Sequence, residues 1–220
     1  MYGSGWLLTG LTALTQTPRL LLLACQAERE PGLAWYAARK RGGEQLLQSH
    51  PKLDWLVVRP PAVYGPGDKE MLPVFKAMSR GIAPVPGQIP ARISLIHVND
   101  LVTALITCLE TPATRHQVLT LCDGQENGYD WRDMANLAST VWGRTVRLWQ
   151  VPARLLDWVA RINVYSARLT GRAPMLTPPK LRELRHPSWV VDNRAITEMT
   201  SWQPTIDLKK GLEILYKAEI

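Results

Sequence analysis

Three segments in succession limit the folds open to this chain. "RLLLLA" (19–24) and "DWLVVR" (54–59) are short continuous apolar runs, the pattern of strands buried on both faces, and the second ends at two prolines. "AWYAARKRGGEQLLQ" lies between them and has a helical pattern, although Gly42 and Gly43 each weaken it by about 1 kcal/mol relative to alanine. Strand, helix and strand in this order build parallel sheets, so the sequence predicts an α/β fold.

Strand and helix patterns keep alternating past residue 150, which extends this prediction over most of the chain. The run "ISLIHV" (93–98) predicts a strand leading into a helix over 100–110, and we expect Asn99 and Asp100 to cap that helix. Further strands are expected at 117–122 and 145–151, and further helices at 7–14, 69–81, 130–142, 152–170, 192–199 and 207–218.

The long helix expected at 152–170 carries two rows of like residues. The apolar row on one side consists of Leu155, Val159, Ile162 and Leu169. Arginines recur every seven residues and are expected on the opposite side; they are Arg154, Arg161 and Arg168. Either of two readings would explain this basic row. It is a solvated face, or it contacts an anionic lipid surface or an acidic partner. Four tryptophans are expected in the core: Trp131, Trp142, Trp149 and Trp158.

Composition narrows the class of protein. The chain has 220 residues, of which 46% are hydrophobic and 20% charged, and this usage is that of a globular protein. The formal net charge is +7, but lysine and arginine are spread along the chain without a block of like charges, so we expect no nucleic-acid partner. The apolar start is interrupted by Gln16, Pro18 and Arg19, so we expect neither a signal peptide nor a membrane span.

The cysteines indicate a reducing compartment and no metal centre. Cys25, Cys108 and Cys122 lack the C-x-x-C spacing of zinc and redox sites. Free thiols are typical of intracellular proteins, so a cytoplasmic location is expected.

Tyr36 and Lys40 stand four residues apart in the helix predicted between the first two strands, and this spacing permits acid–base chemistry. Residues i and i+4 lie on one face of a helix, so the two side chains would be neighbours. An ammonium beside a phenol favours the phenolate and lowers the pKa of the tyrosine from its ordinary value of about 10. Tyrosine then becomes a usable proton donor and acceptor. The same spacing also occurs on ordinary exposed helix faces.

Four motifs give this pair a context. "YAARKRGGEQLL", "VVRPPAVYGPGD" (57–68), "ISLIHVNDLVTALITCLE" (93–110) and "SWQPTIDLKKGLEILY" (201–216) follow one another in the chain. Together they resemble the extended short-chain dehydrogenase/reductases, the NAD-dependent epimerase/dehydratase family, from Arg19 to Tyr216. The resemblance implies a Rossmann-like doubly wound parallel sheet, a bound NAD or NADP, and a small-molecule substrate.

The resemblance also implies roles for individual residues. Tyr36 would be the general acid/base while hydride passes to or from the nicotinamide, and Lys40 would lower its pKa and hydrogen-bond the nicotinamide ribose. A loop would lie along the nicotinamide face and hold the carboxamide; it consists of Pro60, Pro61, Ala62 and Val63.

Cys25 departs from the family pattern. Similar proteins have a serine or threonine at the end of the strand before the tyrosine helix, where "ACQAEREP" places Cys25. A thiol is a weaker hydrogen-bond donor than a hydroxyl, and loss of one donor to a developing oxyanion typically costs about 10² to 10³ in rate. Cys25 is therefore either a weakened third catalytic residue or a buried thiol at a strand end.

The family's Gly-rich phosphate loop is absent from the sequence. Gly3, Gly5 and Gly10 have neither the required spacing nor a preceding strand. We therefore expect an N-terminally truncated, partial Rossmann-like domain over residues 1–125, to which 93–110 returns. A smaller, mostly helical substrate lobe is expected over 126–220. The vacated sheet edge would be apolar, so a second copy or another partner is expected to cover it.

Three functions remain open at this stage, of which binding to an anionic surface through the arginine row of 152–170 ranks last. The first is an NAD(P)-dependent oxidoreductase, epimerase or dehydratase, impaired because the nucleotide loop is missing. The second is a non-catalytic scaffold that keeps the fold and binds a partner. No motif identifies the substrate or distinguishes NAD from NADP.

Overall fold

The structure is a computed structural model that describes residues 19–25, 35–170 and 177–219, with the backbone alone for 35–40 and 167–170. The helix expected at 7–14 lies outside these ranges. No described helix combines the length and the apolar character that crossing a bilayer requires.

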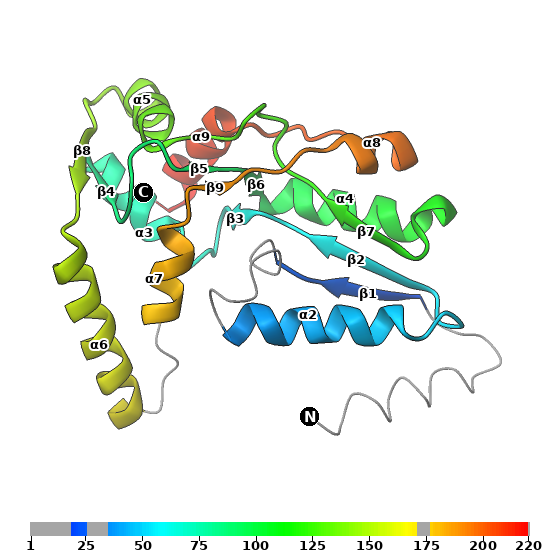
Figure 1. Cartoon of the computed structure of the whole chain (residues 1–220). Coiled ribbons are helices and arrows are strands. Elements are labelled where there is room, and N and C mark those ends of the chain that lie inside the picture. Colours follow the sequence, from blue (N-terminus) through cyan, green and yellow to red (C-terminus); the bar gives the residue numbers. More distant parts are fainter. Residues whose placement is uncertain (1–18, 26–34, 171–176, 220) are drawn as a thin grey trace.

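A three-stranded parallel sheet carries the first part of the fold (Figure 1). Its strands are β1 (Leu20–Leu23), β2 (Trp55–Arg59) and β7 (Gln117–Thr120), in the order β1-β2-β7. Leu21 pairs with Leu56, and Leu56 pairs with Gln117 on its other side. The apolar runs thus form parallel strands, as the sequence predicts, and β2 is buried because it is the central strand.

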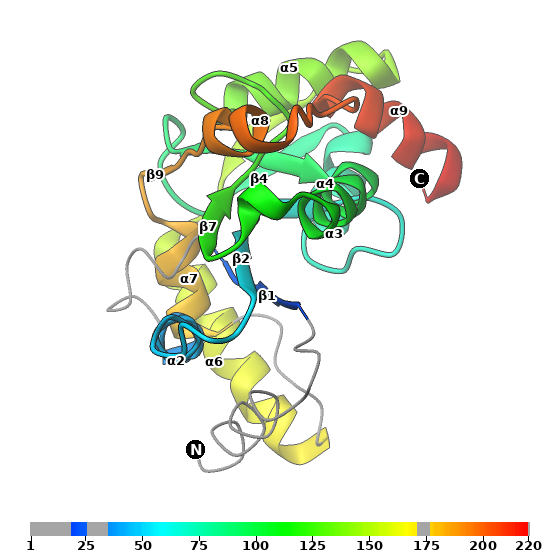
Figure 2. The same ribbon diagram turned by 90° about the vertical axis from the view of Figure 1, so that its right-hand side faces the viewer.

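Helices cover both faces of this sheet. On one face, α2 (Trp35–Gln48) packs through Leu47 against a buried cluster that includes Trp55 and Val57. On the other, α4 (Val98–Glu110) and α8 (Arg194–Thr200) share a cluster with the remaining side chains of β2 and β7. Figures 1 and 2 show α2 and α4 on opposite sides of the strands. The α/β class and the Rossmann-like layering are therefore confirmed.

Short parallel strand pairs extend the fold beyond the sheet. They are β3 (Ala62–Tyr64) with β6 (Leu95–His97), β4 (Ile82–Val85) with β8 (Arg147–Gln150), and β5 (Arg92–Ile93) with β9 (Ser188–Trp189). The other elements are α3 (Leu72–Ser79), the 3-10 turn η2 (Pro112–Thr114), α5 (Trp131–Trp142), α6 (Ala153–Thr170), α7 (Pro178–Leu184) and α9 (Leu208–Ala218). A core around Tyr64 and Phe75 joins α3, α5 and α9.

Two expectations about individual residues were wrong. Asp100 does not cap α4: the helix begins at Val98, and its N-cap is His97, whose Nδ1 accepts a hydrogen bond from the Asn99 N–H at 3.2 Å. Of the four tryptophans expected in the core, Trp131 and Trp142 pack partly buried against it, but Trp149 and Trp158 are exposed.

Candidate active site

The carboxyl edge of the β1-β2-β7 sheet gathers the predicted site residues. Parallel strands present their carboxyl ends at one edge, and open α/β folds bind their ligands there. Cys25 lies two residues beyond β1, Pro60 directly follows β2, and α2 begins at this same edge before running back along the sheet (Figure 1). The topology thus brings three separate segments of the chain together.

Tyr36 and Lys40 both lie in the first part of α2, one turn apart. The helix expected there is confirmed. Their side chains lie outside the described residues, so the contact between phenol and ammonium stays a prediction, as do the catalytic roles of Tyr36, Lys40 and Cys25.

A buried ion pair fixes α2 against the end of β2. Glu44 lies one turn beyond Lys40 and is 2% exposed. The Nε of Arg59 donates to Glu44 Oε1 at 2.8 Å, and Nη2 bonds the other carboxylate oxygen, so the contact is bidentate. Because Arg59 is the last residue of β2, this pair sets the position of the Tyr36 helix relative to the segment that follows the strand.

The segment that the resemblance assigns to the nicotinamide is partly a strand rather than a loop. Pro60 is buried, whereas Ala62 and Val63 open β3 and pair with Leu95 and Ile96. Pairing with β6 holds this backbone at the sheet edge. Whether Pro60, Pro61, Ala62 and Val63 contact a cofactor stays a prediction.

Lys180 on α7 brings the C-terminal part of the chain to this edge. Its Nζ lies 3.1 Å from Glu70 Oε2 and 3.6 Å from Glu183 Oε2. Burial disfavours the charged form, but attraction to Glu70 and Glu183 outweighs burial and raises the pKa of Lys180 above its usual value; a Cys25 thiolate would add to this effect. Lys180 therefore lies within electrostatic reach of Cys25 and remains a cation.

His97 and Asp100 lie at the junction between β6 and α4. Asp100 is 2% exposed; its Oδ2 accepts the N–H groups of Thr205 and Ile206 at 2.9 and 2.8 Å, and its Oδ1 accepts the Thr205 hydroxyl at 2.9 Å. It thereby joins two of the sequence motifs, 93–110 and 201–216. His97 is fully buried with its ring edge-on to Tyr64, and burial lowers its pKa against the opposing effect of Asp100.

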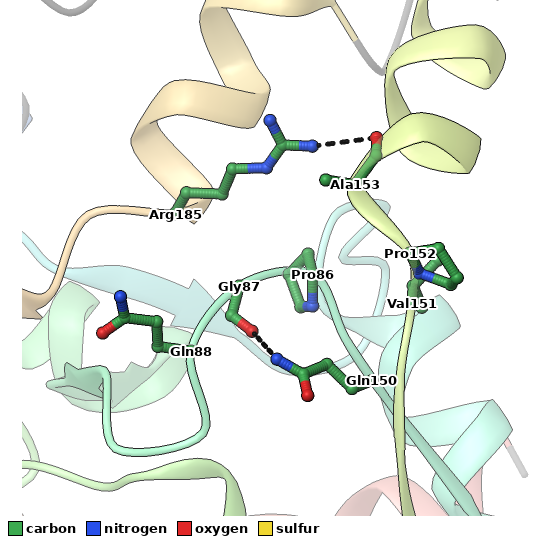
Figure 3. Close-up of a pocket in the computed structure, with 8 residues that line it drawn as sticks. All are labelled: Pro86, Gly87, Gln88, Gln150, Val151, Pro152, Ala153 and Arg185. Carbon is green, nitrogen blue, oxygen red and sulfur yellow. Dashed lines mark hydrogen bonds between the residues drawn. The ribbon is translucent and has the colours of Figure 1, made fainter.

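A cavity of about 450 Å³ opens where β4 and β8 end (Figure 3). Gln150 Nε2 donates to Gly87 O at 3.2 Å across it, and Arg185 Nη2 donates to Ala153 O at 3.2 Å. Arg185 Nε is buried without a hydrogen-bond partner in the described part of the chain. The other lining residues are Pro86, Gln88, Val151 and Pro152. Since Arg185 is the C-cap of α7 and Lys180 lies in its first turn, one short helix links the cavity to the sheet edge.

The sequence predictions missed several of these residues. A charged side chain at the end of a buried strand needs an oppositely charged partner. This rule could have predicted from the sequence that Arg59 pairs with Glu44. Lys180 and Arg185 carry no such signal, because the groups to which they donate hydrogen bonds, among them Glu70 and Ala153, are distant in sequence. Among the described residues, no three His, Cys, Asp or Glu side chains come together as a metal site.

Known proteins resemble this chain in sequence and in fold. Ceramide reductase of Caulobacter vibrioides is 35% identical over 182 residues, which are 82% of this chain and 56% of that protein. The UDP-glucuronic acid 4-epimerase of Bacillus cereus, in complex with UDP-glucuronic acid and NAD, has a TM-score of 0.69 at 15% identity, covering 98% of this chain and 65% of its own. RMD of Pseudomonas aeruginosa, complexed with NADPH, has a TM-score of 0.68 at 18% identity, covering 96% and 69%.

These similarities agree with the order of the four sequence motifs and with the parallel β1-β2-β7 sheet. The chain spans only 56% of the length of ceramide reductase, so the likeness concerns part of that protein. Residues 24–121, from the end of β1 to the end of β7, match the model of one family. The family whose model these residues match is the NAD dependent epimerase/dehydratase family.

Proposed function

We propose that this chain carries the proton-transfer side of an NAD(P)-dependent reductase. The observation that supports it most is the bidentate Glu44–Arg59 pair. It holds α2, with Tyr36 and Lys40 in its first turns, beside the strand end that leads into Pro60. A catalytic helix has to be held rigidly against its cofactor segment, and a buried pair at this junction serves that purpose.

The described residues fit the nicotinamide half of the cofactor. The segment from Pro60 to Val63 and the start of α2 border one sheet edge, and the prolines, which lack an N–H, offer only carbonyl oxygens to a carboxamide. The family depends on NAD, and RMD, which shares the fold, is complexed with NADPH. Bound there, the nicotinamide would donate or accept the hydride.

In this proposal the chain's own residues handle the proton. Tyr36 gives its phenolic proton to the substrate oxygen as the carbonyl becomes an alcohol, and Lys40 favours the phenolate that remains. Cys25 at the end of β1 offers a weak S–H donor to the same oxygen. Lys180 adds a positive charge near Cys25, which favours negative charge developing there.

For the substrate we propose a lipid of the ceramide class. The support is the 35% identity to ceramide reductase over 82% of this chain. The substrate's reactive carbon would lie at the sheet edge and its remainder along α7, toward the cavity at Arg185. Residues 126–220 would then act mainly as the substrate lobe. A cytoplasmic location is part of the proposal, supported by the buried free thiols of Cys108 and Cys122.

Hydride transfer from NADH or NADPH tests the proposal. The substrate is a ceramide whose secondary alcohol is oxidised to a ketone, and UDP-glucuronic acid is tried separately. We expect the ketone to be reduced and Tyr36→Phe to lower turnover by at least about 10². Tyr216→Phe, at an exposed tyrosine of α9, is the matched control.

Turnover that survives Tyr36→Phe overturns the proposal. Conversion of UDP-glucuronic acid alone would point to an epimerase, and cofactor binding without turnover of either substrate would point to the non-catalytic scaffold.

A further inference from the structure

Helix α6 exposes the side that carries its apolar residues. Trp158 is 63% exposed, Ile162 45% and Tyr165 66%, and Leu155 and Val159 are exposed as well. Surface residues of this kind are ordinary when scattered singly, but five of them on one helix form a continuous patch.

The patch points away from the body of the protein. Successive residues of a helix are rotated by about 100° around its axis, so Ile162 lies nearly opposite Ala160. Ala160 is fully buried, and Leu156 and Val164 beside it are partly buried. Asp157, at the border of this inner side, pairs with Arg185 of α7 at 3.1 Å. Figures 1 and 2 show α6 extending from the rest of the molecule next to α7.

Arginines border the patch along one edge. Arg154 and Arg161 are exposed, and each directly precedes a residue of the patch, Leu155 and Ile162. By the same rotation they lie beside the apolar residues. The expectation that they lie on the opposite side was wrong. A row of positive charge therefore runs along a strip of tryptophan, tyrosine and aliphatic side chains.

We propose that α6 binds flat on the surface of an anionic lipid bilayer. Trp158, Ile162 and Tyr165 would enter the boundary between headgroups and acyl chains, and Arg154 and Arg161 would pair with lipid phosphates. Aromatic and aliphatic residues on one side with arginines at the border are the composition of interfacial helices. The inference does not depend on the proposed enzyme activity.

A second exposed apolar surface in the same chain shows why the arginines matter. Val102 and Ile106 of α4 are 48% and 51% exposed, yet α4 contains no lysine or arginine. The two surfaces are alike in apolar character and differ in charge. Attraction to anionic lipid therefore distinguishes α6.

Flotation of the purified chain with lipid vesicles tests this inference. We expect binding to vesicles of phosphatidylcholine mixed with phosphatidylglycerol, and weaker binding to phosphatidylcholine alone or at high salt. The double variant Trp158→Ser/Ile162→Ser should lose at least about tenfold in partition. Arg154→Gln/Arg161→Gln should lose about as much, and only on the anionic vesicles.

Val102→Ser/Ile106→Ser is the matched control and should bind like the unaltered chain. Circular dichroism and thermal melting establish that every variant is folded. Binding that survives Trp158→Ser/Ile162→Ser, or that falls equally in the control, overturns the inference. So does a dimer in vesicle-free solution that these two substitutions convert to a monomer, because the patch would then belong to a contact between two copies of the chain.

Discussion

At the scale of single residues, the pair of Glu44 and Arg59 determines how firmly the candidate catalytic helix is held. Glu44→Gln removes the negative charge that faces the mostly buried guanidinium of Arg59. Breaking such a pair costs about 3 kcal/mol or more, because the remaining charge stays desolvated. We expect the free energy of unfolding in urea to fall by that amount.

The control for Glu44 is Glu126→Gln, at an exposed carboxylate in the loop after β7, which should change stability by less than about 0.5 kcal/mol. If the two variants were equally stable, the pair would not hold α2 in place.

His97 makes stability depend on pH. Burial lowers its pKa, so the folded chain keeps the imidazole neutral where the unfolded chain binds a proton, below about 6.5. Stability from this group is fully present above that pH and is lost as the pH falls toward the lowered folded pKa. We expect the loss to reach at most about 1.4 kcal/mol per pH unit.

The variant His97→Asn isolates this contribution, because its side-chain oxygen can still accept the Asn99 N–H that caps α4. Urea unfolding of both proteins between pH 7 and pH 5 gives the two slopes. As the pH falls, the free energy of unfolding should decrease less for the variant than for the unaltered chain. Equal slopes of stability against pH would contradict the assignment to His97.

At the scale of elements, Asp100 joins α4 to the chain segment before α9. Asp100→Asn keeps the size of the side chain but removes its charge and one acceptor oxygen for Thr205 and Ile206. Hydrogen bonds to a charged group are worth about 1.5 to 3 kcal/mol each, so we expect stability to fall by about 2 kcal/mol. The exposed neighbour Asn99, changed to alanine, is the control.

Hydrogen exchange measures this link directly. The amides of Thr205 and Ile206 should exchange faster in Asp100→Asn, whereas those in the central strand β2 should keep most of their protection. Equal loss of protection at both places would mean that Asp100 acts on global stability and not on this junction.

The sequence predicts elements well where many residues share one pattern. The runs that became β1, β2 and β7 are apolar because both faces of the sheet are covered, and α2, α4 and α5 have clear helical periods. β4 escaped prediction because Pro84 interrupts its apolar run, and β9 did because two residues are too few for a period. The pattern of α6 correctly predicts one apolar side, but a pattern cannot tell whether protein or something else covers it.

The candidate site was predictable only where its residues belong to local motifs. Cys25, Tyr36, Lys40 and the segment after β2 occur in patterns that the sequence shows directly. The contact of Lys180 with Glu70 spans 110 positions and depends on how α7 lies over the sheet edge, so only tertiary structure reveals it.

At the scale of the whole molecule, the proposed cofactor site covers only the nicotinamide half of a dinucleotide. Within the described ranges, no strand, Gly-rich turn and helix follow one another in the arrangement that binds a pyrophosphate at a helix N-terminus. The residues that we assign to the cofactor, from Tyr36 to Val63, all belong to the nicotinamide side. We therefore expect the 220-residue chain to bind NADH with a dissociation constant of about 1 mM, equivalent to about 4 kcal/mol.

Fragments of the cofactor separate the two halves of this site. If the nicotinamide side alone binds, reduced nicotinamide mononucleotide should bind this chain within about threefold of NADH, since a threefold ratio is less than about 1 kcal/mol. ADP-ribose should then fail to compete with either, and fluorescence of the reduced ring measures both affinities. Lys40→Met should weaken the two ligands equally, with Lys52→Met, at an exposed lysine, as the control. Competition by ADP-ribose, or NADH binding a hundredfold tighter than the mononucleotide, would show that this chain also holds the adenine half.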